Sequence, residues 1–323
     1  MREAEIRRIP QTAFRLLVTA TLLWLLLRNV DLHRLSAIAA ASAPYDFIAA
    51  MLLLAATTPA NGLRWQAILY AAGYNSSLVT LMLIQLVGLF FNQFLPSGVG
   101  GDVVRAWRCI KIGIDPGTAI RSVILERAAG YLVMVAAFAA ALPFLWHAMP
   151  GATLRSALLL VLAGSIAGFV SLFFFHQFPR RLTELRWLRS FVGISREARH
   201  LTTMPRAAVT IVGFSTLGLA VTVLGFQTAG AGVGISLSYW EWFAIVPVAS
   251  IIQLLPVSLA GWGVREATFV VLLHAFDIPS ERALTASIAI GVCQLVVSLP
   301  GSLIWLTGRN MGLSQKMSTP DEA

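Results

Sequence analysis

The sequence contains little charge. Asp, Glu, Lys and Arg make up 12% of its 323 residues, against about 25% in a typical soluble domain. Hydrophobic residues make up 57%, and the mean hydropathy is +0.77. The stretches without any charged residue are 47–63, 65–101, 128–146, 156–179, 207–240, 242–264 and 283–308. Because about 20 apolar residues of helix cross the ~30 Å hydrocarbon core of a bilayer, this composition predicts an all-α polytopic membrane protein.

Other residue types are also scarce, and their scarcity excludes several kinds of site. The two cysteines, Cys109 and Cys293, lie far apart and predict neither a disulfide framework nor a zinc site. The five histidines show no spacing typical of a metal site or a catalytic triad. The P-loop, G-x-S-x-G and H-E-x-x-H motifs are also absent from the sequence. We therefore expect no metal and no cofactor.

The charge that is present is mostly positive. Of the 24 basic residues 22 are arginine, and the net charge is +9. The arginines concentrate between hydrophobic stretches, so they indicate membrane topology rather than nucleic-acid binding. We expect the protein to lie in the cell (inner) membrane. The arginine-rich segment 179–206 and both termini should face the cytoplasm. The leucine spacing in this segment fits an amphipathic helix on the membrane surface, and an ordinary charged loop equally well.

Five apolar segments precede residue 179. They are 12–28, 45–62, 78–95, 122–146 and 155–177. Because the N-terminus and segment 179–206 are both expected on the cytoplasmic side, an even number of membrane crossings must lie between them. Segment 78–95 runs into L-P-S-G-V-G-G-D-V-V-R (95–105), where proline and glycines end a regular helix. Irregular backbone at membrane depth must be covered by protein or water, so we interpret this segment as one arm of a re-entrant hairpin.

A second stretch repeats this pattern. P-V-S-L-A-G-W-G-V-R-E (256–266) has a glycine, a valine and an arginine five, eight and nine residues after its proline, as the first stretch does. Residues 102–127 are rich in cations and 241–282 in anions, which predicts that the two hairpins open to opposite sides. We therefore expect about six transmembrane helices and two opposed re-entrant hairpins in an inverted repeat, an architecture of many transporters.

The expected organisation is one transmembrane domain, residues 1–310. Its first half covers about 10–178, a basic connector covers 179–206, its second half covers 207–308, and 309–323 form a short cytoplasmic tail. Tryptophans near the predicted span ends indicate an aromatic belt at the membrane surfaces. They are Trp24, Trp65, Trp146, Trp240, Trp242 and Trp305.

Charged side chains gather at the two hairpins. They are Asp102, Arg105, Glu126, Arg127, Arg265 and Glu266. An ionised group at the bilayer centre costs roughly 2.5–3.5 kcal/mol, so such residues are candidates for function. The three arginines suit a lipid phosphate, and the three carboxylates would orient them or exchange protons. The alternative is that all six form structural ion pairs.

Uncharged residues complete the candidate substrate site. Asn92, Gln93 and Gln253 lie just before the two prolines, where they either cap the broken helices or contact the substrate. Glycines would allow the backbone to approach a headgroup, and the N-termini of half-helices favour anionic groups. The remaining candidates are Pro96, Gly100, Gly101, Pro256, Gly261 and Gly263.

Several motifs resemble the lysylphosphatidylglycerol synthase transmembrane family of flippase-like proteins. The motifs are F-L-P-S-G-V-G-G-D-V-V-R (94–105), S-V-I-L-E-R-A-A-G (122–130), G-W-G-V-R-E-A (261–267) and L-P-G (299–301). The resemblance covers about residues 10–308 and implies a domain that moves lipid between leaflets. The residues of this sequence that match the family motifs, and that the resemblance therefore implies are functional, are Gly100, Gly101, Asp102, Arg105, Glu126, Arg127, Gly261, Gly263, Arg265 and Glu266.

In the best-known members of this family, a soluble aminoacyl transferase follows the membrane domain. Here about fifteen residues follow the last predicted helix, so we do not expect lipid aminoacylation. The resemblance associates stand-alone members with glycosyltransferase, polyprenyl-lipid or hopanoid pathways.

The leading hypothesis is a lipid translocase without enzymatic activity. It would hold an anionic or zwitterionic headgroup of a phospholipid, or of a polyprenyl- or hopanoid-linked lipid, between the hairpins. One alternative is a membrane enzyme of lipid-linked glycan or hopanoid synthesis, with Asp102, Glu126 or Glu266 as its acid or nucleophile. The other is a scaffold, in which the basic segment 180–206 binds a peripheral glycosyltransferase or lipid-modifying enzyme.

Overall fold

The computed structural model describes residues 43–94, 100–149, 151–174, 186–254, 263–307 and 315–316. Within these ranges the chain is helical, apart from two short strands that pair antiparallel, β1 (Tyr74–Asn75) and β2 (Gln315–Lys316). This confirms the predicted all-α class. The apolar segment 12–28, the site candidates Pro96, Pro256 and Gly261, and most of the C-terminal tail lie outside the described residues.

Five described helices are long and apolar enough to cross a membrane. They are α4 (Pro44–Ala71), α7 (Pro116–Ala148), α8 (Ala152–Phe174), α11 (Pro205–Gly232) and α14 (Ser280–Leu306). At a rise of 1.5 Å per residue, the 28 residues of α4 extend roughly 40 Å, more than the thickness of the hydrocarbon core. The chain is therefore a polytopic membrane protein, as predicted.

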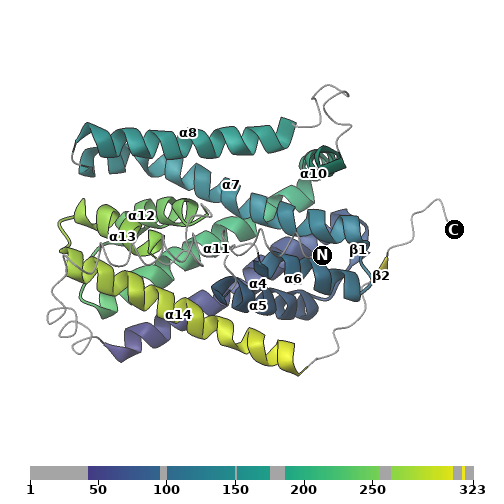
Figure 1. Ribbon diagram of the computed structural model, residues 1–323, viewed down its shortest axis with the longest axis horizontal. Coiled ribbons are helices and arrows are strands. Elements are labelled where there is room, and N and C mark those ends of the chain that lie inside the picture. The colour runs from purple at the N-terminus through teal and green to yellow at the C-terminus, as the bar shows by residue number, and fades with distance from the viewer. Residues whose placement is uncertain are drawn as a thin grey trace, which may run out of the picture.

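Proline marks the beginning of most of these helices. Proline is the first residue of α4, α7 and α11. Proline has no backbone N–H, and at the first position of a helix that N–H would have no partner within the helix. At α7 the preceding Asp115 also caps the helix, because its Oδ2 accepts a hydrogen bond from the Thr118 N–H at 2.9 Å. Figure 1 shows α8 lying along α7 at one margin of the bundle, with α14 toward the opposite margin.

Four shorter helices form two pairs. In the first pair, α5 (Leu78–Phe94) packs against α6 (Gly100–Lys111). In the second, α12 (Tyr239–Ile252) packs against α13 (Val264–His274). The longest has 17 residues and extends roughly 25 Å, less than the hydrocarbon core. These pairs occupy the two segments in which the sequence predicts hairpins.

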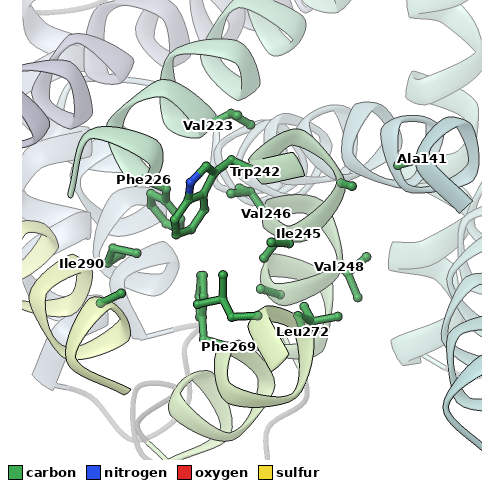
Figure 2. Close-up of a cluster of buried hydrophobic side chains, with 14 of the residues drawn as sticks. Ala141, Val223, Phe226, Trp242, Ile245, Val246, Val248, Phe269, Leu272 and Ile290 are labelled. Atoms are coloured by element: carbon green, nitrogen blue, oxygen red, sulfur yellow. The ribbon is translucent and has the colours of Figure 1, made fainter. Parts of the chain in front are cut away.

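The largest apolar core joins α7, α11, α12, α13 and α14 around Trp242. Figure 2 shows the indole of Trp242 beside Phe226 and near Phe269, both also buried. Gly230 makes room for this indole, since a Cβ on Gly230 would overlap the Trp242 ring. Trp65 is fully buried as well. The prediction that Trp65 and Trp242 belong to the aromatic belt is therefore wrong, because both side chains point into the bundle.

The basic connector forms helix α10 (Arg186–Thr203) over most of its described part, so it is a helix rather than an ordinary loop, and its placement on the membrane surface stays a prediction. Its apolar face buries Ile194, Ala198 and Leu201 in a cluster that includes Leu125 of α7. An ion pair between Arg121 Nε and Glu197 Oε2 at 2.6 Å also ties α10 to α7. The connector is therefore packed onto the bundle rather than extended away from it.

Candidate functional site

A buried network of ion pairs joins α4, α6 and α7. Its centre is Glu126, which is 3% exposed and pairs with Arg64 through Oε1 and with Arg105 Nη2 through Oε2, the latter at 2.9 Å. Arg105 Nη1 also lies 3.3 Å from Asp102 Oδ1, and Asp102 pairs with Arg127. We call these five residues the arginine network.

Helix geometry explains how four of these residues come together. Asp102 and Arg105 are three residues apart on α6, which places both on one face. Glu126 and Arg127 are neighbours on α7, so their side chains leave the helix about 100° apart. Glu126 therefore reaches the two arginines, while Arg127 reaches the carboxylate of Asp102.

Glycines allow α5 and α6 to approach closely enough to hold Arg105. A Cβ on Gly101 would overlap the carbonyl oxygen of Gly88, and a Cβ on Gly88 would lie 2.6 Å from the Arg105 side chain. The Gly101 N–H donates to Asn92 Oδ1 at 2.9 Å. The guanidinium of Arg105 lies 4.3 Å above the ring of Trp65, which adds a cation–π contact. These contacts hold both the aliphatic part and the guanidinium group of Arg105 in place.

The network carries more positive than negative charge. Three guanidinium groups face two carboxylates, a surplus of one positive charge among buried and half-buried groups. Ser215 of α11 accepts a hydrogen bond from Arg64 Nη1 at 3.3 Å but brings no charge. Buried charge is unfavourable unless it is paired, so this arrangement favours a bound anion.

The network opens into a cavity of about 370 Å³ between α4, α5, α7, α11 and α14. Arg64, Arg105, Glu126 and Arg127 line it. Two residues of its lining carry a buried donor that has no hydrogen-bond partner among the described residues, Gln85 Nε2 and Arg105 Nε. Gln85 is 5% exposed, and Arg105 is 7% exposed. A buried donor without a partner is rare in folded proteins, and a bound ligand is one explanation for it.

The second hairpin holds its arginine differently. Arg265 Nη2 pairs with Glu266 Oε1 at 2.6 Å, and Glu266 Oε2 accepts the N–H of Gly263 at 2.5 Å. The guanidinium packs against α14 at Gly291, where a Cβ would overlap it. Among the described residues, the lining of the 370 Å³ cavity includes neither Arg265 nor Glu266.

The remaining candidates have separate positions. Asn92 lines the cavity, and Gln93 is half-buried on the same helix. Gln253 donates through Nε2 to the Ala249 carbonyl of its own helix at 3.1 Å. Gly100 is buried at the start of α6. The structure thus gathers Arg105, Glu126 and Arg127 at one cavity with Asp102 paired to both arginines, whereas Arg265 and Glu266 form a separate pair.

Sequence reasoning missed three residues of the site, Arg64, Gln85 and Ser215. Arg64 had a visible signal, since it is the single charged residue between the uncharged stretches 47–63 and 65–101. An ionisable residue inside a membrane helix is a functional candidate by default. Gln85 and Ser215 gave no comparable signal, because uncharged polar residues are common along these helices.

Comparisons with known proteins agree with this architecture. The family model described as lysylphosphatidylglycerol synthase TM region matches residues 12–301. The UPF0104 membrane protein MJ1595 of Methanocaldococcus jannaschii is 25% identical to this chain over 122 residues, which cover 37% of this chain and 36% of that protein. The resemblance seen in the sequence motifs is confirmed. Since the family model spans most of its length, the protein belongs to the family of the lysylphosphatidylglycerol synthase TM region.

Proposed function

We propose that the protein is a lipid translocase that binds an anionic lipid headgroup in the 370 Å³ cavity. The observation that carries this proposal is the surplus positive charge of the arginine network beside two unpartnered donors. Phosphate oxygens would balance the charge and, once these side chains turn toward the cavity, would accept hydrogen bonds from both donors. The three arginines act as headgroup ligands, and the two carboxylates orient them.

The charge balance favours an anion over a net-neutral headgroup. At an effective dielectric of about 20, two unit charges about 4 Å apart interact by roughly 4 kcal/mol. A zwitterionic headgroup brings its own cation and loses part of that energy, because the surplus guanidinium repels it. The expected substrate is therefore a lipid whose headgroup carries a net negative charge, such as a phosphodiester lipid or a polyprenyl phosphate.

The packing of the helices supports an inverted repeat. The pattern of contacting helices is unchanged when α4, α5, α6 and α7 are exchanged with α11, α12, α13 and α14. For example, α5 packs against α14 as α12 packs against α7, and α6 packs against α7 as α13 packs against α14. Such repeats commonly place a substrate site between two broken-helix elements near the midplane.

This symmetry supports the topology that the sequence predicts. The α5–α6 and α12–α13 pairs would be the two re-entrant hairpins, too short to cross and opening to opposite sides. Six crossings, with the first at residues 12–28, would place both termini in the cytoplasm. Each hairpin would give the headgroup a binding position that is reached from one side of the membrane.

Native mass spectrometry of the purified protein tests the binding step. The wild type should retain anionic lipids in excess of their share of the membrane extract. Arg64→Gln leaves Glu126 paired with Arg105 but removes the charge surplus, so the preference for anionic lipids should disappear. The double variant Arg64→Gln/Glu126→Gln restores the surplus and should restore the preference.

Circular dichroism and size-exclusion chromatography show whether each variant is folded. If all folded variants retain the same lipids as the wild type, the arginine network is structural and the proposal fails.

A further inference from the structure

A second, larger cavity lies on the outer side of α4. Its volume is about 740 Å³, and no described residue lines both this cavity and the cavity of the arginine network. Leu63, Ala67 and Tyr70 form its wall on α4, and Met204 and Ala207 form its wall at the junction of α10 and α11. We call this cavity the outer groove. Its walls are mostly apolar, as in sites that bind hydrophobic ligands.

The two cavities use different faces of the same helix. Residues 63, 67 and 70 follow the helical spacing that places side chains on one face of α4. Arg64, Trp65 and Ile68 lie on other faces, where they are buried against neighbouring helices. The outer groove is therefore separate from the arginine network, although α4 contributes to both.

The outer groove lies where two membrane-crossing helices end. α4 ends at Ala71 and α11 begins at Pro205, and both residues line the groove. The ends of apolar spans mark the boundary between hydrocarbon and headgroups. The groove therefore opens at the ends of these two apolar helices, beside the last residues of α10.

The chain segment that leads to this opening is rich in arginine. Between residues 186 and 206 the chain has five arginines and one acidic residue, Glu197, which already pairs with Arg121. Arg206 lines the groove itself and is exposed. Basic residues at a membrane surface attract anionic lipids by about 1 kcal/mol each. An apolar groove that has Arg206 in its lining and lies at the ends of two apolar helices is complementary to a phospholipid that has a negative headgroup.

We propose that the outer groove binds an anionic phospholipid from the leaflet that faces α10. One acyl chain lies along Leu63, Ala67 and Tyr70, and the phosphate lies at Arg206. The bound lipid fills the space between the end of α4 and the start of α11, next to the last turn of α10. The proposal is independent of what the central cavity binds, because the two cavities have separate linings over the described part of the chain.

Occupancy of the outer groove would also hold α10 in place. The buried face of α10 packs in one cluster with Ile68, one turn after Arg64, and with Leu125, the neighbour of Glu126. A lipid beside the last turn of α10 would therefore stabilise the packing of this cluster. We expect the unfolding temperature of the protein to rise more with anionic than with zwitterionic lipid.

Lipid titration of delipidated protein tests this site. Phosphatidylglycerol and phosphatidylcholine are added in turn, and bound lipids are counted by native mass spectrometry. Arg206→Gln should weaken phosphatidylglycerol binding about fivefold, the loss expected for one cation. Ala67→Phe should remove one bound lipid because its ring fills the groove. Ala207→Phe fills the groove from the other wall and should do the same if Ala67→Phe does not fold.

Matched controls change the same residue types elsewhere. Arg282→Gln removes a half-buried arginine that donates to the Gly234 carbonyl at another part of the chain. Val209→Phe enlarges a residue that is 72% exposed on α11 but does not line the groove. Both should bind phosphatidylglycerol as the wild type does. Gln85→Leu, a change in the central cavity, should leave the outer groove occupied.

Three results would overturn the proposal. The first is unchanged binding by folded Arg206→Gln and groove-filling variants. The second is equal binding of phosphatidylglycerol and phosphatidylcholine at this site, which would remove the role of charge. The third is that a polypeptide, rather than a lipid, occupies the groove. Such a polypeptide would co-purify with the wild type, would be lost from the groove-filling variants, and would not be displaced by added lipid.

Discussion

Replacing Gln85 with leucine separates ligand binding from folding more cleanly than any change to the arginines. Gln85 is buried on α5, lines the central cavity, and its Nε2 has no hydrogen-bond partner among the described residues. Leucine has a similar size but no donor. Without lipid, removing an unpartnered buried donor should be neutral or stabilising. The substitution therefore spares the ion pairs that an arginine variant would break.

The expected effect appears only when lipid is bound. A hydrogen bond from an amide to a charged phosphate oxygen contributes about 1.5–3 kcal/mol, and 1.4 kcal/mol corresponds to a tenfold change in affinity. Gln85→Leu should therefore weaken binding of an anionic lipid by roughly 10- to 150-fold. The free energy of unfolding of the delipidated protein should stay the same or rise.

Two measurements check this prediction. Lipid affinity comes from titration by native mass spectrometry, and stability comes from thermal unfolding of delipidated protein. Ser287→Ala serves as the control, because Ser287 Oγ is also buried without a partner among the described residues but lies outside the cavity lining. Its affinity should equal that of the wild type. Wild-type affinity in Gln85→Leu would refute the assignment of this cavity to a headgroup, and a large loss of lipid-free stability would show that Gln85 has a structural partner.

Two further predictions concern the fold. Gly101→Ala places a Cβ against the backbone of Gly88, so chemical unfolding should show a loss of about 1–3 kcal/mol, whereas Gly164→Ala, with open space around it, should show none. The Thr118 N–H lowers the pKa of Asp115, so the stability that this cap provides should be present above the unfolded pKa of Asp115 and be lost as the pH falls through its folded pKa. Asp115→Ala should cost about 1 kcal/mol at neutral pH and remove that part of the pH dependence.

The membrane class and most helix positions could be predicted because both depend on local composition. Uncharged stretches are visible in one dimension, and prolines mark where α4, α7 and α11 begin. The span predicted at 45–62 ends too early, since α4 continues to Ala71. That early end placed Arg64 at a membrane surface, whereas the folded helix carries it into the bundle.

The partners within the site could not be predicted, because they depend on how helices pack. Arg64 and Glu126 are 62 residues apart, and no sequence pattern pairs them. The hairpin motifs indicated Arg105 and Arg265 equally, yet Arg105 lines a cavity while Arg265 pairs with its neighbour Glu266. Internal similarity of sequence therefore predicted corresponding positions but not corresponding environments.

Lipid movement in reconstituted vesicles tests the central claim most directly. Vesicles contain acyl-labelled fluorescent phosphatidylglycerol, and added dithionite destroys the label exposed in the outer leaflet. The account predicts that wild-type protein makes label from the inner leaflet accessible, that labelled phosphatidylcholine moves more slowly, and that Gln85→Leu slows phosphatidylglycerol movement. Bleaching no greater than in protein-free vesicles, for each anionic lipid tested including a polyprenyl phosphate, would contradict it.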